Sequence, residues 1–317
     1  MFDFFSKPFG LHITDSAVYA APVTQNNVQL RVIAAHKQAL APGIVANGRI
    51  MQQIPLANAI TELLTGAQPQ PITSKKCIVA IPESQSYEHI FHFPAALHGE
   101  DLAREIAAKI ADTIPLSPAE TKFDFVTYSF GKEQIVFAVA VPRVVIAEYF
   151  EVLKSLCSLH PIIFEPELFG MIRNLPLSLD VKAGFIFAYV LDGYITWSTL
   201  WLNMIFDSAR TPLEQVVKNP KIFLKDLEAS QESFHRVSGL HVKNVLIAGQ
   251  KDGVAALQNA LGAHTALTVT AQKNFRTRAD ALPPDSMDEL NVAIGLALKN
   301  IPALYPSSTI DLLRRRA

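Results

Sequence analysis

Short apolar runs separated by polar turns fill the first 82 residues of the chain. Apolar and β-branched residues predict strands at 9–13, 17–23 and 29–35. Between residues 55 and 64 the apolar positions repeat at helical spacing, which predicts a helix. The continuous apolar run at 76–82 ends at a proline and is typical of a strand buried on both faces. Together these elements form half of an α/β layer.

A different order of elements begins at residue 83. The pattern predicts a strand at 89–93, a helix at 100–113, a hairpin from 123–130 to 134–141, and a helix at 144–158. This strand–helix–hairpin–helix block has the size of a small α+β domain inserted into a larger one.

The second half repeats the opening plan. After a strand at 162–164 and a short helix at 167–174, the pattern predicts strands at 185–191, at 195–202 and from 205, a helix at 212–237, a buried strand at 242–248, and helices at 253–261 and 288–300. Each half opens with a tight hairpin and closes with a buried strand. We therefore predict an α/β fold that contains an internal duplication.

Residues 185–206 form the one segment long enough to be taken for a membrane helix. Asp192 and Gly193 interrupt it, and a central aspartate costs roughly 2.5–3.5 kcal/mol on insertion scales. Its aromatic and β-branched residues favour strands, and an Asp-Gly pair between apolar runs is a turn signal. The sequence predicts a β-hairpin here and no membrane span.

Composition narrows the functional classes. The 317 residues are 50% hydrophobic and 18% charged, which is typical of a globular protein. Lys and Arg total 28 against 29 for Asp and Glu, so the basic excess of a nucleic-acid binder is missing. Cys77 and Cys157 form no CxxC and no Cys/His cluster, so we expect no metal site, no disulfide, and a reducing, cytoplasmic compartment. The first residues do not have the pattern of a signal peptide.

Several short strings occur in the order typical of one family. They lie at residues 5–7 and 10–19, 41–45 and 48–50, 80–84, 114–117 and 123–125, 165–167, and 295–299. The string at 10–16, Gly-Leu-His-Ile-Thr-Asp-Ser, resembles the Asp-Ile-Gly turn that opens the family's sequences, and Ile-Pro-Glu-Ser at 81–84 resembles a later strand end. In this order they resemble the PilM family, the actin-like cytoplasmic proteins of type IV pilus assembly, with the cell-division protein FtsA as a more distant relative.

The resemblance implies an actin-like fold with two duplicated, ribonuclease-H-like lobes and a small α+β domain inserted in the first lobe. The insertion predicted above from the pattern coincides with that plan. We divide the chain into residues 1–82 (the start of the first lobe), 83–161 (inserted α+β domain), 162–182 (first lobe, continued), 183–287 (second lobe), and 288–317 (a helix returning to the first lobe, then a basic tail).

In actin-like folds, backbone N–H groups of two strand–turn–strand loops hold the nucleotide phosphates, and aspartates position Mg²⁺. The resemblance implies six nucleotide-binding residues: Thr14, Asp15 and Ser16 in the first loop, Gly193 and Thr196 in the second, and Gly249 on the adenosine side. His12 and Leu191 stand where the family has aspartates, and Asp192 is one position off, which turns its side chain to the other face. We therefore predict no catalytic residue, no metal ligand and no useful rate of hydrolysis.

Two interpretations of this cleft stay open. In the first, His12 and Thr14 are ordinary turn residues and no nucleotide binds. In the second, ATP or ADP binds weakly and without Mg²⁺, because the turn still offers N–H and hydroxyl donors. Neither interpretation requires a cofactor.

The resemblance implies a non-enzymatic scaffold on the cytoplasmic side of the inner membrane. Its expected partners are the N-terminal cytoplasmic peptide of a PilN-like inner-membrane protein and other pilus assembly proteins, with membrane contact only through a partner. The peptide groove is expected between the first lobe and the inserted domain, walled by parts of 78–93 and by the inserted helices. Residues 309–313, Thr-Ile-Asp-Leu-Leu, resemble the Ile-Asn-Leu-Leu phrase that begins PilN-type peptides, and related phrases also end PilM chains.

Two alternatives stay open beside this hypothesis. One is an active actin-fold ATPase or small-molecule kinase, which needs a phosphate-loop aspartate and a catalytic carboxylate. The other is an actin-like cytoplasmic component of type II secretion.

Overall fold

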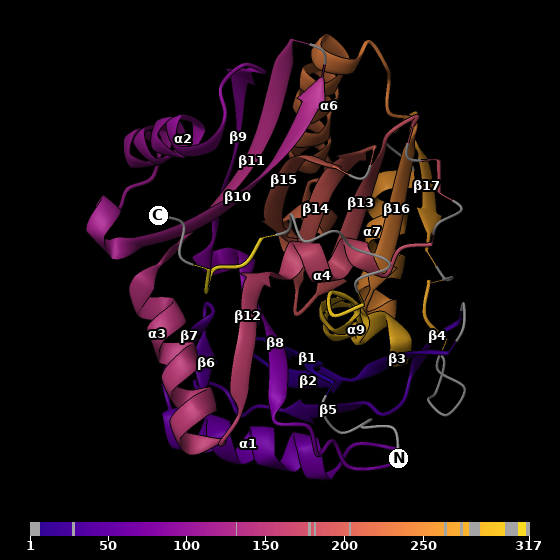
Figure 1. The fold of residues 1–317 in the computed structure, drawn as a ribbon. Coiled ribbons are helices and arrows are strands. Elements are labelled where there is room, and N and C mark those ends of the chain that lie inside the picture. Colours follow the sequence, from indigo (N-terminus) through magenta and orange to yellow (C-terminus); the bar gives the residue numbers. More distant parts are fainter. Residues whose placement is uncertain are drawn as a thin grey trace. The chain divides into compact units, whose positions relative to one another are not determined.

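The computed structural model describes residues 7–26, 29–130, 132–176, 179–180, 182–202, 204–262, 265–272, 275–278, 286–301 and 310–314. The chain forms two compact units (Figure 1). Unit 1 comprises residues 1–173, 277–282 and 292–317, and unit 2 comprises residues 174–276 and 283–291. The finer division into five segments stays a prediction. Phe5, Ser6, Gly131, Thr309 and the last arginines, 315 and 316, which carry some of our sequence predictions, lie outside the described residues.

A five-stranded mixed sheet is the centre of unit 1. Its strands, in spatial order, are β12 (His160–Pro166), β8 (Lys76–Ile81), β1 (Phe9–Ile13), β2 (Ala17–Ala21) and β5 (His36–Ala39). β1 runs antiparallel to β2 and parallel to β8, while β8 and β12 are also parallel. All residues of β1 and β2 are buried, which accounts for their continuous apolar character.

A separate antiparallel sheet of unit 1 lies between β8 and β12 in sequence. It consists of β9 (Tyr87–Pro94), β10 (Thr121–Phe130) and β11 (Glu133–Pro142), with β11 in the middle. Helix α2 (Gly99–Thr113) packs one apolar stripe, Leu102, Ile106 and Ile110, against this sheet. The helix ends where Ile114 turns extended before Pro115, as steric restriction before proline requires.

Unit 2 is built on a second five-stranded sheet. Its strands, in spatial order, are β15 (Met204–Pro212), β14 (Tyr194–Trp201), β13 (Phe185–Leu191), β16 (Asn244–Gly249) and β17 (Thr268–Ala271). β13 and β14 pair as an antiparallel hairpin closed by Asp192 and Gly193, so the hairpin that the sequence predicts is confirmed. Among the described helices, none has both the length and the apolar character that crossing a bilayer needs.

The two large sheets share one topology. In each, the first strand pairs antiparallel with the second, the second antiparallel with the third, and the first parallel with the fourth, which is parallel to the fifth. The internal duplication predicted from the sequence is therefore confirmed at the level of strand order.

The remaining elements cover these sheets or connect them. They are β3 (Val23–Asn26), β4 (Gln29–Val32), β6 (Val45–Ala46), β7 (Arg49–Ile50), α1 (Gln53–Thr65), η2 (Glu83–Gln85), η3 (Pro118–Glu120), α3 (Arg143–Glu151), η4 (Val152–Leu156), α4 (Glu167–Arg173), α5 (Leu213–Lys218), α6 (Pro220–Ser238), α7 (Lys251–Gly262), α8 (Ser286–Glu289) and α9 (Asn291–Leu298).

Three sequence predictions about elements are wrong in detail. The third strand of the first sheet is β5, while β4 pairs with β3 and forms an isolated bridge from Arg31 to Arg278. The sequence pattern does not predict β5, because its residues are mostly polar and half exposed. The helix predicted over 212–237 is two helices, because Pro220 cannot donate a backbone hydrogen bond and so begins a new helix after Asn219. The helix predicted over 288–300 is α9 alone, and α8 precedes it.

Helix α9 is buried along its whole length within unit 1, and glycines let the backbone approach it closely. A Cβ on Gly10 of β1 would lie 1.8 Å from the carbonyl oxygen of Ala293, and a Cβ on Gly295 would lie 1.8 Å from that of Gly170 in α4. Contacts this short have no room for a methyl group. The apolar character of α9 on all sides agrees with the burial of all its residues.

A buried ion network fixes the end of α9. The carboxylate of Glu165 in β12 accepts two hydrogen bonds from Arg173, at 2.6 and 2.9 Å, and one from Lys299 at 2.5 Å. Desolvation opposes ionisation, but the charges and hydrogen bonds of Arg173 and Lys299 outweigh it and lower the pKa of Glu165. Arg173 also donates to the carbonyl oxygen of Gly295 at 2.8 Å. The network therefore joins β12, α4 and α9.

The glycine contact generates a stability prediction. We expect Gly295→Ala to destabilise unit 1 by about 1–3 kcal/mol, because the added methyl group meets a carbonyl oxygen that belongs to a packed helix. The measurement is urea unfolding followed by circular dichroism. Gly262→Ala at the end of α7 is the control, since nothing lies within 4 Å of its Cβ position. Equal midpoints for the two variants would contradict the packing argument.

Candidate functional site at the strand ends

The β1–β2 turn is closed by its own threonine. The Thr14 hydroxyl oxygen accepts hydrogen bonds from the backbone N–H groups of Ser16 at 3.3 Å and Ala17 at 3.1 Å. The Thr14 N–H donates to the Ala17 carbonyl at 2.9 Å. Three N–H groups around this predicted phosphate loop thus have acceptors within the turn itself.

Asp15 is exposed and supports a neighbouring turn. Its carboxylate accepts hydrogen bonds from the backbone N–H groups of Asn47 at 2.7 Å and Gly48 at 2.9 Å. Both residues have positive φ, 48° and 74°, and close the short β6–β7 hairpin. The carboxylate therefore holds a strained turn in place.

His12 lies next to a carboxylate instead of replacing one. Its side chain is fully buried, and Nε2 is 3.0 Å from Oε2 of Glu167 at the start of α4. The imidazole also stacks on Tyr19, with ring centroids 5.5 Å apart. Among the described residues, the other ring nitrogen, Nδ1, has no hydrogen-bond partner.

Three glutamates gather beside His12 at the carboxyl edge of the first sheet. Glu83 follows β8 after Pro82, and Glu167 follows β12 after Pro166; because these strands are parallel, both residues emerge at the same edge. An oxygen of Glu83 accepts the backbone N–H of Leu168 at 3.0 Å. Desolvation raises the pKa of Glu83 well above its ordinary value, and the nearby carboxylates of Glu88 and Glu167 raise it further.

Sequence reasoning missed these glutamates as site residues. The signal was present, since a buried strand is followed by Pro-Glu twice, at 82–83 and 166–167. What the sequence could not supply is that strands 85 positions apart are neighbours in one sheet, with the His12 strand beside them.

In unit 2, Gly193 and Gly249 of the predicted site are brought close by one side chain. The β13–β14 turn has positive φ at Asp192 (50°) and Gly193 (77°), and the N–H of Asp192 donates to Oε1 of Gln250 at 3.1 Å. Gln250 directly follows Gly249, whose φ of 117° and 2.0 Å distance from its Cβ position to the Val190 carbonyl oxygen admit only glycine. Thr196 lies further along β14 and is buried.

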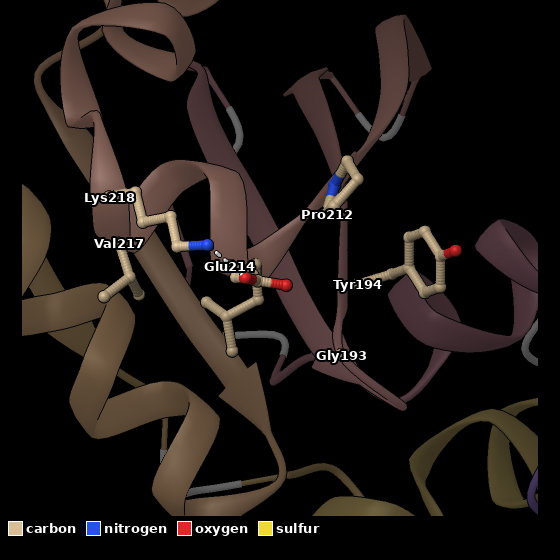
Figure 2. A pocket seen from close by; sticks show the side chains of 7 residues that line it. Gly193, Tyr194, Pro212, Glu214, Val217 and Lys218 are labelled. Atoms are coloured by element: carbon tan, nitrogen blue, oxygen red, sulfur yellow. Dashed lines mark hydrogen bonds and ion pairs between the residues drawn. The ribbon is translucent and has the colours of Figure 1, made fainter.

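A shallow hollow of about 490 Å³ lies beside the β13–β14 turn (Figure 2). It is lined by Gly193, Tyr194, Pro212, Leu213, Glu214, Val217 and Lys218. Glu214 and Lys218 form an exposed ion pair with each other, and the guanidinium of Arg210 lies 3.8 Å from the centre of the Tyr194 ring. Of the six predicted residues, Gly193 alone is among those that line this hollow. The two ionised side chains that line it, Glu214 and Lys218, are paired with each other.

The predicted site residues described above take part in hydrogen bonds and packing within each unit. No group of three or more His, Cys, Asp or Glu side chains within the described portion of the chain could hold a metal ion. Thr14, Asp15 and Ser16 share one turn, while Gly193 lies in the β13–β14 turn and Gly249 ends the neighbouring strand β16. Whether these residues bind a nucleotide stays a prediction.

Comparison with known proteins agrees with the resemblance seen in the sequence. Residues 10–145 match the family model described as type IV pilus assembly protein PilM. No curated protein sequence matches the chain significantly. Among solved structures, the PilM-PilN type IV pilus biogenesis complex aligns with a TM-score of 0.74 at 17% identity, over 93% of this chain and 98% of that chain.

A second similar structure comes from protein secretion. The cytoplasmic domain of EpsL, an inner membrane component of the type II secretion system of Vibrio cholerae, aligns with a TM-score of 0.53 at 12% identity, over 98% of this chain and 99% of that chain. The chain thus has the duplicated α/β, actin-like fold that the resemblance implied. The match over residues 10–145 agrees with the resemblance of the sequence to the PilM family of type IV pilus assembly proteins.

The glutamate cluster generates a prediction about pH. A carboxyl whose pKa is raised by folding destabilises the folded state at every pH above its unfolded value, and the effect grows until the folded pKa is passed. We expect Glu83→Gln, which imitates the protonated carboxyl, to raise the melting temperature at pH 8 by a few degrees, since about 1 kcal/mol shifts it by roughly 2–4 °C. At pH 4 the difference from the unchanged protein should vanish.

Thermal unfolding across this pH range checks the prediction. Glu62→Gln, on an exposed position of α1, is the matched control and should show no such trend. A Glu83→Gln protein that is less stable at pH 8 than at pH 4, relative to the unchanged protein, would mean that the charged form of Glu83 is the one folding favours.

Proposed function

We propose that the chain is a scaffold of type IV pilus assembly on the cytoplasmic side of the inner membrane. It binds the N-terminal cytoplasmic peptide of a PilN-like inner-membrane protein and reaches the membrane through that partner. The observation that carries this proposal is the family match over residues 10–145. The similarity in fold to the PilM-PilN complex supports it over 93% of the chain.

The proposal includes a cleft that does no Mg²⁺-dependent chemistry. His12 occupies a position where the family has an aspartate, and it is buried against Glu167. Asp15 is engaged by two backbone N–H groups, and the Asp192 N–H is engaged by Gln250. Because these donors and acceptors already have partners in the chain, a phosphate or Mg²⁺ has to displace internal hydrogen bonds in order to bind. We therefore expect at most weak binding of ATP or ADP, whether at Thr14, Asp15 and Ser16 of unit 1 or at Gly193, Thr196 and Gly249 of unit 2.

Peptide capture needs no reactive group. The sheet of β9, β10 and β11 in unit 1 has β9 and β10 at its edges, and its one face is covered by α2. An extended peptide recognised at such a sheet uses backbone hydrogen bonds for affinity and pockets for alternate side chains for specificity. The edge strands β9 and β10 support this mode of binding.

A second candidate is an actin-like cytoplasmic component of type II secretion. The observation in its favour is the alignment with the EpsL cytoplasmic domain over 98% of the chain. We favour pilus assembly, because the family match is specific to PilM and the TM-score is higher for the PilM-PilN complex.

The partner prediction is tested by calorimetry. We expect the purified protein to bind a synthetic peptide from the N-terminus of the PilN-like membrane protein encoded beside it, with micromolar affinity or better. A scrambled peptide of the same composition is the control. If folded protein shows no heat change at high micromolar peptide while circular dichroism confirms the fold, the adaptor function is wrong.

The chemical prediction is tested by phosphate release from ATP with and without Mg²⁺. We expect no turnover above that of a protein-free sample, because no aspartate occupies the His12 or Leu191 position. Magnesium-dependent hydrolysis that is abolished by Asp15→Asn or Asp192→Asn would overturn this prediction and favour the ATPase.

A further inference from the structure

Residues 310–314, here called the 310–314 segment, lie against two strands of unit 1. The N–H of Leu312 donates to the carbonyl of Phe164 in β12 at 2.8 Å, and the N–H of Asp311 donates to Oδ2 of Asp124 in β10 at 2.6 Å. Figure 1 shows the segment in yellow beside β12. It therefore contacts both the first large sheet and the separate sheet formed by β9, β10 and β11.

Alternate side chains of the segment are buried. Ile310 is 0% exposed and Leu312 is 1% exposed, while Asp311 and Leu313 between and after them are partly exposed and Arg314 is exposed. The backbone then turns, because the N–H of Arg314 donates to the carbonyl oxygen of Asp311 at 3.0 Å. The segment is therefore a short apolar–polar–apolar peptide that ends in a turn.

The side chains that contact the segment form hydrogen bonds with its main chain. The Asp124 carboxylate is fully buried and accepts a backbone N–H, and Lys122 of the same strand donates to the carbonyl oxygen of Arg314. At the other end, Lys299 contacts the carbonyl oxygen of Ile310 while it is paired with Glu165. A buried charged group on each side thus holds the backbone of a short peptide.

None of these contacts depends on the covalent connection between the segment and the rest of the chain. Main-chain hydrogen bonds, one buried carboxylate, one buried ammonium and the burial of two apolar side chains are equally available to a separate peptide with apolar residues two positions apart. We infer that this surface is a binding site for a short peptide with the alternation of Ile310, Asp311 and Leu312, and that the 310–314 segment occupies it within the same chain.

This inference rests on the proposed function, because it makes the segment a competitor of the partner peptide. Eight residues, 302–309, connect Ile301 of unit 1 to Ile310. A connection this short gives the segment an effective concentration in the millimolar range, so a separate peptide has to compete against it. Removing the segment is expected to strengthen the binding of a free peptide by about tenfold or more.

The probe for the test is a fluorescein-labelled synthetic peptide with the sequence of residues 307–317. Its binding is measured by fluorescence anisotropy to the full chain and to a chain shortened to end at Thr309. We expect the shortened chain to bind at least about tenfold more tightly than the full chain. A peptide with Ile310→Ser and Leu312→Ser should bind neither protein.

Variants separate recognition from folding. In the shortened chain, Asp124→Ala should weaken peptide binding by about tenfold or more, because the buried carboxylate accepts a peptide N–H, whereas Glu133→Ala at the exposed start of β11 should not change it. If the shortened chain does not fold, full-length protein with Leu312→Asp replaces it, since this change releases the segment and keeps the chain intact.

The outcomes distinguish this inference from the proposed function. Absence of peptide binding to both the shortened chain and the folded Leu312→Asp protein overturns the inference, and a PilN-like peptide that still binds the full chain then leaves the proposed function standing. Binding of the 307–317 peptide that the PilN-like peptide displaces supports both. If the 307–317 peptide binds while the PilN-like peptide binds neither protein, the inference is supported and the proposed partner is wrong.

Discussion

The ion pairs of the buried Glu165 carboxylate are the interaction on which the rest of unit 1 depends. It is fully buried, and it pairs with both Arg173 and Lys299, which come from the helix after its own strand and from the end of α9. Removing one partner of a buried pair leaves an uncompensated charge and typically costs about 3–5 kcal/mol. Because Arg173 also binds the Gly295 carbonyl and Lys299 contacts the Ile310 carbonyl, this single carboxylate links β12, α4, α9 and the 310–314 segment. The glycine contacts at residues 10, 170 and 295 then set how closely these elements approach.

Duplication of the sheet has kept the strand order but not the chemistry of the turns. In both units the first two strands are joined by a tight turn, and buried or constrained N–H groups in such turns need acceptors. A bound phosphate is one kind of acceptor, and a side chain is another. Here the acceptors come from the chain, with the Thr14 hydroxyl in unit 1 and the Gln250 amide in unit 2. The same duplicated frame therefore holds two turns that are hydrogen-bonded without any ligand.

The sequence predicts the helices and strands that have a strong local pattern. It does not predict those that depend on contacts with residues far away in the chain. Helix α2 and the β13–β14 hairpin follow from apolar spacing and from an Asp-Gly turn, so the sequence predicts them within a few residues. Strand β5 escapes such reasoning because His36–Ala39 is polar and half exposed, and only pairing with β2 makes it a strand. His12 stands out as a departure from the family pattern, but its contact with Glu167, 155 positions away, depends on three strands meeting at one edge. No local pattern encodes that meeting.

The contacts of the 310–314 segment indicate that unit 1 is suited to peptide binding. A site that binds main-chain N–H groups and alternate apolar side chains needs two walls at a fixed separation, and it needs no nucleophile or metal. One wall is β12, held by the Glu165 network; the other is β10, held by a ladder with β11 that runs along its whole length. Both walls belong to unit 1, and their contacts with the segment are main-chain hydrogen bonds and buried apolar side chains. Recognition of this kind requires a rigid frame and no reactive group, and this is the physical basis on which we propose a scaffold.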